Sequence, residues 1–135
     1  MKELTLEAKV ENINAVTAFV DEQLEAQDCA MKAQMQIDVA IDEIFGNIAH
    51  YAYAPGTGEA TVRFEFEPAA RMACVCFIDS GIAYNPLEAK TPDTTLAAED
   101  REIGGLGIFL VRKTMDDVTY ERKDGKNILR LFKKI

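Results

Sequence analysis

The stretch 38-DVAIDEIFGNIAHYAY-53 brings three polar side chains into register on a predicted helix. At about 100° per residue, Asn47 lies about 40° and His50 about 20° from Glu43, so a carboxylate, an amide and an imidazole form one narrow line. Gly46 borders this line, and a glycine inside a helix costs about 1 kcal/mol relative to alanine. A glycine is explained here if a ligand must approach the backbone closely. On this stretch alone, an amphipathic helix whose weakly polar side simply faces water remains an open alternative.

Two later segments carry groups that suit an aromatic ring and phosphate oxygens. The segment 79-DSGIAYNP-86 ends an apolar strand in an aspartate and a glycine. A carboxylate there can accept a hydrogen bond from an exocyclic amine such as that of adenine, and Gly81 would let a flat ring lie against the backbone. In 104-GGLGIFLVRKTM-115, glycines lead directly into an apolar helix, whose free N–H groups and dipole favour phosphate oxygens. Either segment alone also fits an ordinary glycine-rich turn.

The periodicity of the sequence predicts the elements that hold these segments. Alternating or continuous apolar residues predict strands at 3–10, 62–66, 72–79, 117–123 and 127–134, and helical periods predict helices at about 12–27, 30–52 and 106–115. Residues 80–105 have little periodicity and predict a long loop. Asp124–Gly125 is a strong hairpin signal. The order βα-αββ-loop-αββ predicts an α/β sandwich with its helices on one face of the sheet.

Length, composition and charge exclude several classes of protein. A chain of 135 residues is expected to form one domain, and 48% hydrophobic with 28% charged residues is typical of a globular protein. The net charge of −8 argues against wide contact with the phosphate backbone of nucleic acid. No apolar run has the length of a membrane span or the character of a signal peptide, so we expect a protein that does not enter a membrane.

The cysteines favour a reduced, cytoplasmic protein. Cys74 and Cys76 lie two apart in an apolar run, where a strand places both on one face, and this favours buried thiols over a disulfide. A zinc site built from these two residues with Cys29 and His50 is the alternative, but no CxxC spacing supports it.

In this order and spacing, the three segments resemble those of the Bergerat-fold ATP-binding proteins, the superfamily of the histidine-kinase catalytic domains and gyrase-type ATPases. The chain looks most like the small stand-alone anti-sigma-factor serine/threonine kinases of bacteria. The matching stretches are DEIFGNIAHYAY, DSGIAYNP and REIGGLGIFLVRKTMDDVTYERKDGKN, which cover most of residues 36–130. The resemblance implies a two-layer α/β sandwich with a mixed, largely antiparallel sheet. Residues 1–135 would form one histidine kinase-like ATP-binding domain with an ATP lid at about 80–105.

The resemblance also implies roles for the polar line of the second helix. Glu43 would be the general base that takes the proton from an attacking hydroxyl. Asn47 would ligate Mg²⁺ through its amide oxygen, a hard donor suited to an ion that stays largely hydrated. His50 would lie near the phosphates, where relatives often carry a basic residue.

Further nucleotide contacts are implied for the segments that contain glycine. Asp79 would bind the adenine amine with Gly81 beneath the ring, and Asn127 would replace a threonine that relatives often place near adenine. The phosphate-facing end of a mobile lid would be formed by three glycines, Gly104, Gly105 and Gly107. Arg101, in the same lid, would stabilise the charge of the transition state.

The implied function is transfer of the γ-phosphoryl group of Mg²⁺-ATP to a serine or threonine of a small anti-sigma-factor antagonist. In the resembling family, the unphosphorylated antagonist competes with a sigma factor for the kinase. One alternative is a regulator that binds ATP as a switch and sequesters its partner without phosphorylating it. Another is a structural domain that binds no nucleotide. The resemblance also implies a homodimer, for which the N-terminal strand is a candidate interface, although an ordinary position in the sheet fits that strand equally well.

Overall fold

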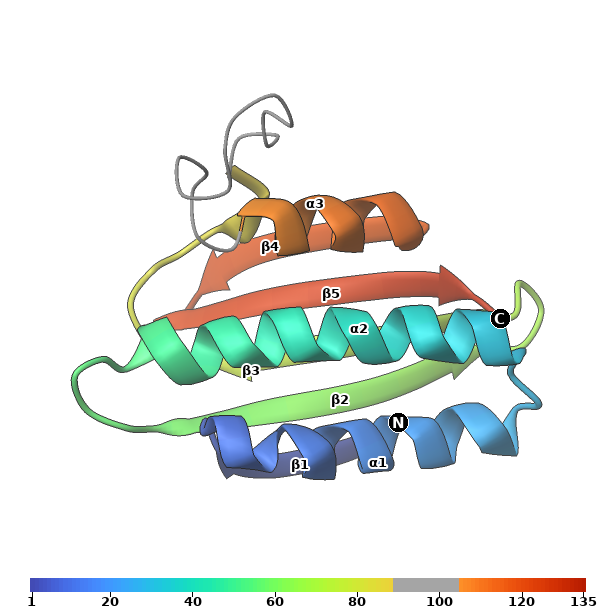
Figure 1. Cartoon of the computed structure of the whole chain (residues 1–135), viewed down its shortest axis with the longest axis horizontal. Coiled ribbons are helices and arrows are strands. Elements are labelled where there is room, and N and C mark those ends of the chain that lie inside the picture. Colours follow the sequence, from blue (N-terminus) through green and yellow to red (C-terminus); the bar gives the residue numbers. More distant parts are fainter. Residues whose placement is uncertain (89–104) are drawn as a thin grey trace.

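The computed structural model describes residues 1–88 and 105–135 of the chain (Figure 1). Helices and strands follow one another in the order that the periodicity predicted, and short helical segments lie between some of them. The elements are β1 (Lys2–Glu7), η1 (Val10–Asn12), α1 (Ile13–Ala26), α2 (Met31–Asn47), η2 (Ile48–Ala52), β2 (Glu59–Glu67), β3 (Met72–Asp79), η3 (Pro86–Glu88), α3 (Gly105–Thr114), β4 (Asp117–Lys123) and β5 (Lys126–Lys134).

The strands form one sheet in the order β1-β2-β3-β5-β4, and each pairing in it is antiparallel. Helices α1, α2 and α3 lie side by side across one face of this sheet (Figure 1). The expected α/β sandwich is therefore confirmed, with an antiparallel sheet throughout where a mixed, largely antiparallel one was expected. The core lies between the helices and the sheet.

Strand β3 occupies the middle of the sheet, as its apolar character predicted. Phe77 faces the helices at 1% exposure, and Cys76 on the opposite face is 7% exposed. Strands β4 and β5 are joined through Asp124 and Gly125, whose φ angles are 53° and 76°. Two successive positive φ angles are typical of the tight turn of a two-residue hairpin, so the hairpin prediction is also confirmed.

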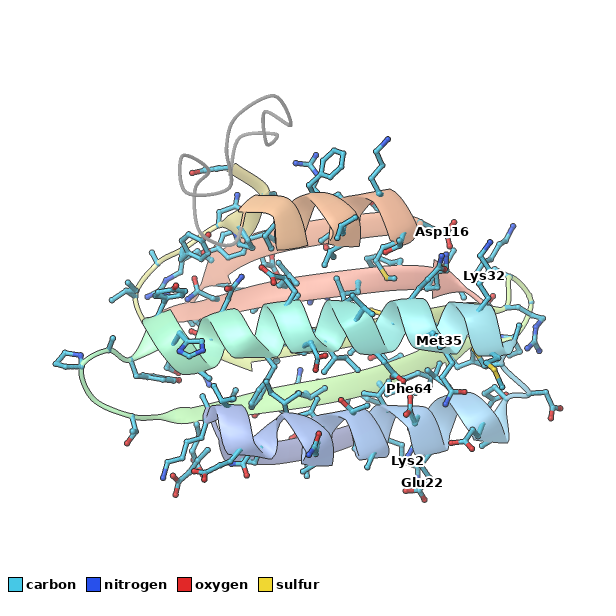
Figure 2. The ribbon with its side chains drawn as sticks, viewed as in Figure 1. Lys2, Glu22, Lys32, Met35, Phe64 and Asp116 are labelled. Carbon is cyan, nitrogen blue, oxygen red and sulfur yellow. The ribbon has the colours of Figure 1, made fainter. Side chains whose placement is uncertain are left out.

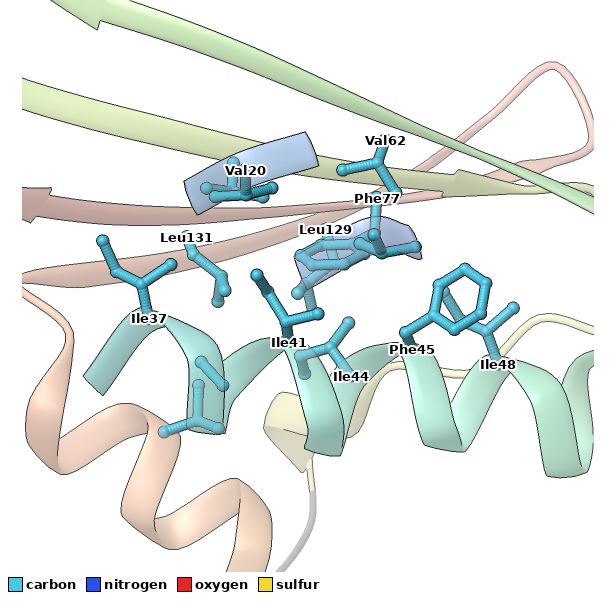
Figure 3. Packing of buried hydrophobic residues seen from close by; sticks show 14 of the residues in the cluster. Val20, Ile37, Ile41, Ile44, Phe45, Ile48, Val62, Phe77, Leu129 and Leu131 are labelled. Atoms are coloured by element: carbon cyan, nitrogen blue, oxygen red, sulfur yellow. The ribbon is translucent and has the colours of Figure 1, made fainter. Parts of the chain in front are cut away.

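Helix α2 buries the face that its apolar period predicted. This face consists of large side chains that are at most 9% exposed, namely Ile37, Ile41, Ile44, Phe45 and Ile48. They belong to one cluster with Val62, Phe77, Leu129 and Leu131 of the sheet and Val20 of α1 (Figure 3). Fully burying one such side chain contributes about 1.5–3 kcal/mol, so this face fixes α2 firmly on the sheet.

The end of the second helix differs from the prediction. The sequence predicted one helix over 30–52, but α2 ends at Asn47 and Ile48–Ala52 form a π-helical turn. The carbonyl of Ala52 accepts a hydrogen bond of 2.9 Å from the N–H of Ile82, which ties this turn to the segment that follows β3. Because a π-turn is wider than an α-turn, residues after Asn47 no longer continue the straight line drawn from the sequence.

The remaining differences concern the ends of elements. Strand β1 ends at Glu7, because the next N–H, of Ala8, bonds the carbonyl of Gly58 and the chain then enters η1. Most of the loop predicted at 80–105, with Arg101 and Gly104, lies outside the described residues. In the part of the chain that the structure describes, no helix combines the length and apolarity required to cross a bilayer.

Candidate functional site

The end of β3 carries the first polar group of the site. Asp79 is the last residue of this strand and is 6% exposed, because the alternation that buries Phe77 also turns Asp79 toward the helices. Its Oδ1 accepts hydrogen bonds of 2.9 Å from the N–H of Gly81 and from Nδ2 of Asn127. Within residues 1–88 and 105–135, no group donates to its Oδ2. That oxygen can therefore accept a hydrogen bond from the amine of a ligand.

Asn127 holds this carboxylate in place. It faces Asp79 across the β3–β5 pairing and is 7% exposed. Its Nδ2 also donates to the carbonyl of Ile82 at 2.7 Å, and its Oδ1 accepts from the hydroxyl of Tyr120 and the N–H of Tyr84. Both amide hydrogens and both acceptor positions are used within the protein. The geometry favours a positioning role for Asn127 over the direct adenine contact that the resemblance implied.

Tyr120 is a residue of the site that sequence reasoning missed. The two-residue hairpin pairs Tyr120 with Leu129 and Arg122 with Asn127, so Tyr120 lies on the same face of the sheet as Asn127. This register follows from the Asp124–Gly125 signal, which could have placed the tyrosine next to the amide.

A cavity lies between the end of α2 and the sheet. Its walls combine apolar and aromatic side chains with a few polar ones, namely Ile44, Asn47, Ile48, Tyr51, Ala52, Phe77, Asp79, Ile82, Tyr84, Pro86, Tyr120, Asn127 and Leu129. Sites for small molecules typically have this composition, in which apolar walls hold a ring and a few polar groups fix its orientation. The residues present fit an aromatic base with an exocyclic amine, since Asp79 provides a buried acceptor in a largely hydrocarbon wall.

Glu43 and Asn47 form a contact at the edge of this cavity. They lie one turn apart on α2, and Nδ2 of Asn47 donates to Oε1 of Glu43 at 3.3 Å. Burial raises the pKa of the Glu43 carboxyl, and the hydrogen bond from Asn47 opposes this shift. Because the contact uses the nitrogen of the Asn47 amide, the amide oxygen can serve as a hard donor to a cation.

The first turn of α3 lies directly against Glu43. A Cβ atom built on Gly107 would lie 2.2 Å from Cδ and Oε2 of Glu43, so a side chain at this position would collide with the carboxylate. Helix α3 begins at Gly105, close to the start that the sequence predicted. The structure thus brings a helix N-terminus, which favours anions, next to the polar pair of α2.

Other predicted residues occupy different surroundings. His50 is exposed on the π-turn, with its ring centroid 6.0 Å from that of Tyr51, and it does not line the cavity. Gly81 does not line the cavity either, because it packs on Ala52, whose carbonyl oxygen would lie 2.2 Å from an added Cβ. A Cβ at Gly46 would meet no described atom within 4 Å.

The thiols lie apart from this site. Cys74 and Cys76 lie on the sheet face away from the helices, in a hollow also lined by Arg63, Glu65 and Arg130. Burial raises the pKa of Cys74 to about 11, so this thiol is protonated and unreactive at neutral pH. The cysteines are free, as expected, and the described ranges contain no group of three or more His, Cys, Asp or Glu arranged to hold a metal ion.

Comparisons with known proteins agree with this geometry. The family model of the histidine kinase-like ATPase domain matches residues 6–133. A serine/threonine-protein kinase BtrW of Bordetella bronchiseptica is 30% identical over 100 residues, which are 74% of this chain and 70% of the relative. A serine-protein kinase RsbW of Bacillus mycoides is 25% identical over 131 residues, covering 94% of this chain and 81% of the relative.

A solved structure has the same fold at low identity. The SiaB–SiaC complex from Pseudomonas aeruginosa contains a chain that matches 98% of this one with a TM-score of 0.59 and 18% identity, over 89% of its own length. The family model spans nearly the whole chain, and the relatives named as kinases span most of it. This chain therefore belongs to the histidine kinase-like ATPase domain family.

Proposed function

We propose that this protein is a Mg²⁺-ATP-dependent serine/threonine kinase that phosphorylates an anti-sigma-factor antagonist in the cytoplasm. The observation that carries the proposal is one continuous site, in which the cavity at Asp79 meets Asn47, and Asn47 contacts Glu43 under the first turn of α3. The kinase names of BtrW and RsbW support the reaction class. A chain of the same fold forms part of the SiaB–SiaC complex, which supports a protein partner.

The base of the nucleotide would occupy the cavity at the end of β3. Asp79 would accept the hydrogen bond from the adenine amine through Oδ2, since its Oδ1 is held by Gly81 and Asn127. The N–H groups at the start of α3 would face the phosphates. When bound, Mg²⁺-ATP would supply the phosphoryl group that is transferred, and the metal would neutralise its charge.

Glu43 and Asn47 would act on the transferring group. Asn47 would hold Mg²⁺ through Oδ1, with Nδ2 fixed by Glu43. Glu43 would accept the proton of the serine or threonine hydroxyl. Burial raises the pKa of Glu43 and thereby increases its basicity, which suits a general base. Arg101, which lies outside the described residues, remains a proposed contact to the transferring group.

The test is phosphoryl transfer from γ-labelled ATP with Mg²⁺ to the antagonist-type proteins encoded in the same genome. Wild type is expected to label a serine or threonine of one of them, and Glu43→Gln is expected to bind ATP without labelling it. Glu22→Gln, an exposed position on α1, is the matched control and should label like wild type. ATP at about a hundredfold its Kd should stabilise each variant by about 2.7 kcal/mol. Equal labelling by Glu43→Gln would contradict the role given to Glu43.

One observation favours a second function, that of an ATP-dependent regulator that sequesters its partner. The first turn of α3 packs directly against the Glu43 carboxylate at Gly107, and this contact restricts the space for an incoming hydroxyl beside the base. A sequestering regulator would retain ATP unchanged, bind an antagonist or a sigma factor, and transfer no label. The same assay therefore separates the two functions.

A further inference from the structure

A groove between α2 and α3 exposes an unusual number of apolar side chains. This α2–α3 groove has a volume of about 580 Å³ and is lined by Met31, Lys32, Met35, Gln36, Val39, Ala40, Leu110, Val111 and Thr114. Met31 is 77%, Met35 61%, Val39 58% and Leu110 46% exposed. Lys32 and Met35 lie in the first turns of α2, close to where α3 ends (Figure 2). Apolar side chains gathered in one depression are typical of an interaction site, whereas scattered ones are not.

The groove leads to the proposed catalytic base. Val39 precedes Glu43 by one helical turn, and Leu110 follows Gly107 by about one turn, so each pair lies on the same side of its helix. Gly107, in the first turn of α3, and Glu43, toward the C-terminal end of α2, are in contact where these two rows end. A segment lying in the groove would therefore approach Glu43 along the line of the two helices.

The charged groups around the groove indicate what charge a protein partner would carry. Lys32 is the one charged side chain among the described residues that line it. At the same end, Nζ of Lys133 donates to the carbonyl of Thr114 at 2.6 Å. The acidic side chain of Asp38, in this part of α2, interacts instead with Asp21 of α1. In a chain of net charge −8, the described residues that line this groove carry one positive charge and no negative charge.

We propose that the α2–α3 groove docks an amphipathic helix of the protein substrate, with apolar residues on one side and acidic residues beside them. This proposal rests on the proposed kinase function and assigns its substrate-binding surface. A helix with apolar residues one turn apart matches a groove between two helices, and unbranched methionines adapt to the shape of such a partner. The acidic flank complements Lys32 and Lys133, and docking would bring the substrate close to Glu43.

A labelled helical peptide tests the groove without depending on catalysis. The probe is a designed peptide of about 18 residues with leucines one turn apart and glutamates beside them, and its binding is followed by fluorescence anisotropy. Wild type and Val10→Glu, a control at an exposed apolar residue outside the groove, should bind equally. Met35→Glu should weaken binding at least about tenfold, as should replacing the glutamates of the peptide by lysines. Equal binding by all three proteins, or no saturable binding, would overturn the inference.

Kinetics with the unphosphorylated form of the antagonist that wild type labels separate this inference from the proposed function. Met35→Glu should raise KM for the antagonist about tenfold with a much smaller effect on kcat. Unchanged KM would refute the docking site and leave the kinase intact. Absence of transfer by wild type would refute the proposed kinase function. The peptide result would still show whether the groove binds a helix. Conversion of a wild-type dimer into a monomer by Met35→Glu, seen by light scattering, would identify the groove as a self-association surface and overturn the proposal.

Discussion

Gly107 and Glu43 are in such close contact that a side chain at residue 107 would displace the Glu43 carboxylate, because an added Cβ would lie 2.2 Å from Cδ of Glu43. The carboxylate is the free end of a flexible side chain, so it can move aside where a backbone atom could not. This contact couples the position of α3 to the orientation of Glu43. The two motifs are separated in sequence by β2 and β3, and they meet only in the folded chain.

Gly107→Ala should therefore impair phosphoryl transfer without unfolding the protein. Alanine favours a helix by up to about 1 kcal/mol over glycine, and we expect the displaced Glu43 carboxylate to cancel this gain. Misplacing the base should lower the transfer rate about a hundredfold. Urea denaturation and the labelled-ATP assay measure the two effects.

A double-mutant cycle isolates the contact. In a Glu43→Ala background there is no carboxylate to displace, and Gly107→Ala should then stabilise the protein by up to about 1 kcal/mol. An equal stability gain from Gly107→Ala in both backgrounds would show that the two residues do not interact.

Gly81→Ala should destabilise the protein even without nucleotide. An added Cβ would lie 2.2 Å from the carbonyl oxygen and 2.6 Å from the carbonyl carbon of Ala52, and backbone atoms cannot move aside cheaply. We expect a loss of about 2 kcal/mol, which is typical of overpacking. Urea denaturation without ATP measures it. Unchanged stability with weaker ATP binding would instead support the role beneath the adenine ring that the family resemblance implied.

Most of the fold could be predicted because helices, strands and tight turns each impose a spacing or residue preference on neighbouring residues in the sequence. Alternation defined the strands, the helical period identified the buried face of α2, and Asp124–Gly125 set the last hairpin. The end of the second helix could not be predicted, because its π-turn depends on a hydrogen bond between Ala52 and Ile82, which lie in different elements. Long-range contacts of this kind leave no periodic signal in the sequence.

Most residues of the candidate site were predicted from the sequence, but the contacts between them were not. The structure places Asp79, Asn47 and Asn127 around one cavity and sets Gly107 on Glu43. It leaves His50 exposed outside the cavity, since the π-turn changes the direction of the side chains after Asn47. The close packing of Gly81 on Ala52 depends on tertiary structure, which a glycine in a sequence does not specify.

Tyr120→Phe should weaken ATP binding through Asn127. The Tyr120 hydroxyl donates to Oδ1 of Asn127, whose Nδ2 fixes the Asp79 carboxylate. Removing it should destabilise the protein by about 1 kcal/mol and raise the Kd for ATP several-fold. Calorimetry measures both quantities. Tyr51→Phe removes a hydroxyl from the same cavity at a half-exposed position and should change neither, so equal effects of the two substitutions would refute the role of Tyr120.

A pair of carboxyl groups between α1 and α2 makes stability depend on pH. Oδ1 of Asp21 and Oδ1 of Asp38 are buried without a hydrogen-bond partner among the described residues. The two carboxyl groups can form a hydrogen bond with each other only when one of them carries a proton. Burial, the proton that Asp38 can share with Asp21 in this way, and the charges of Asp21, Asp42 and Glu25 raise the pKa of Asp38 from 3.8 to about 7. The folded protein therefore binds a proton at Asp38 that the unfolded chain releases between these two values.

Asp38→Asn should stabilise the protein, and more so at high pH. With a raised pKa in the folded state, stability falls as pH rises from 3.8 toward 7, and the full penalty is present above about 7. Asparagine carries no charge and can donate to Asp21, so it should add about 1 kcal/mol at pH about 8, since water still screens part of this half-buried group. The gain should be smaller at pH about 5, where Asp38 is protonated in the folded state.

Urea denaturation of both proteins across this range measures the difference, with Glu22→Gln on the exposed side of α1 as the control. A stability gain that does not vary with pH, or one that Glu22→Gln reproduces, would show that the two carboxyl groups do not share a proton.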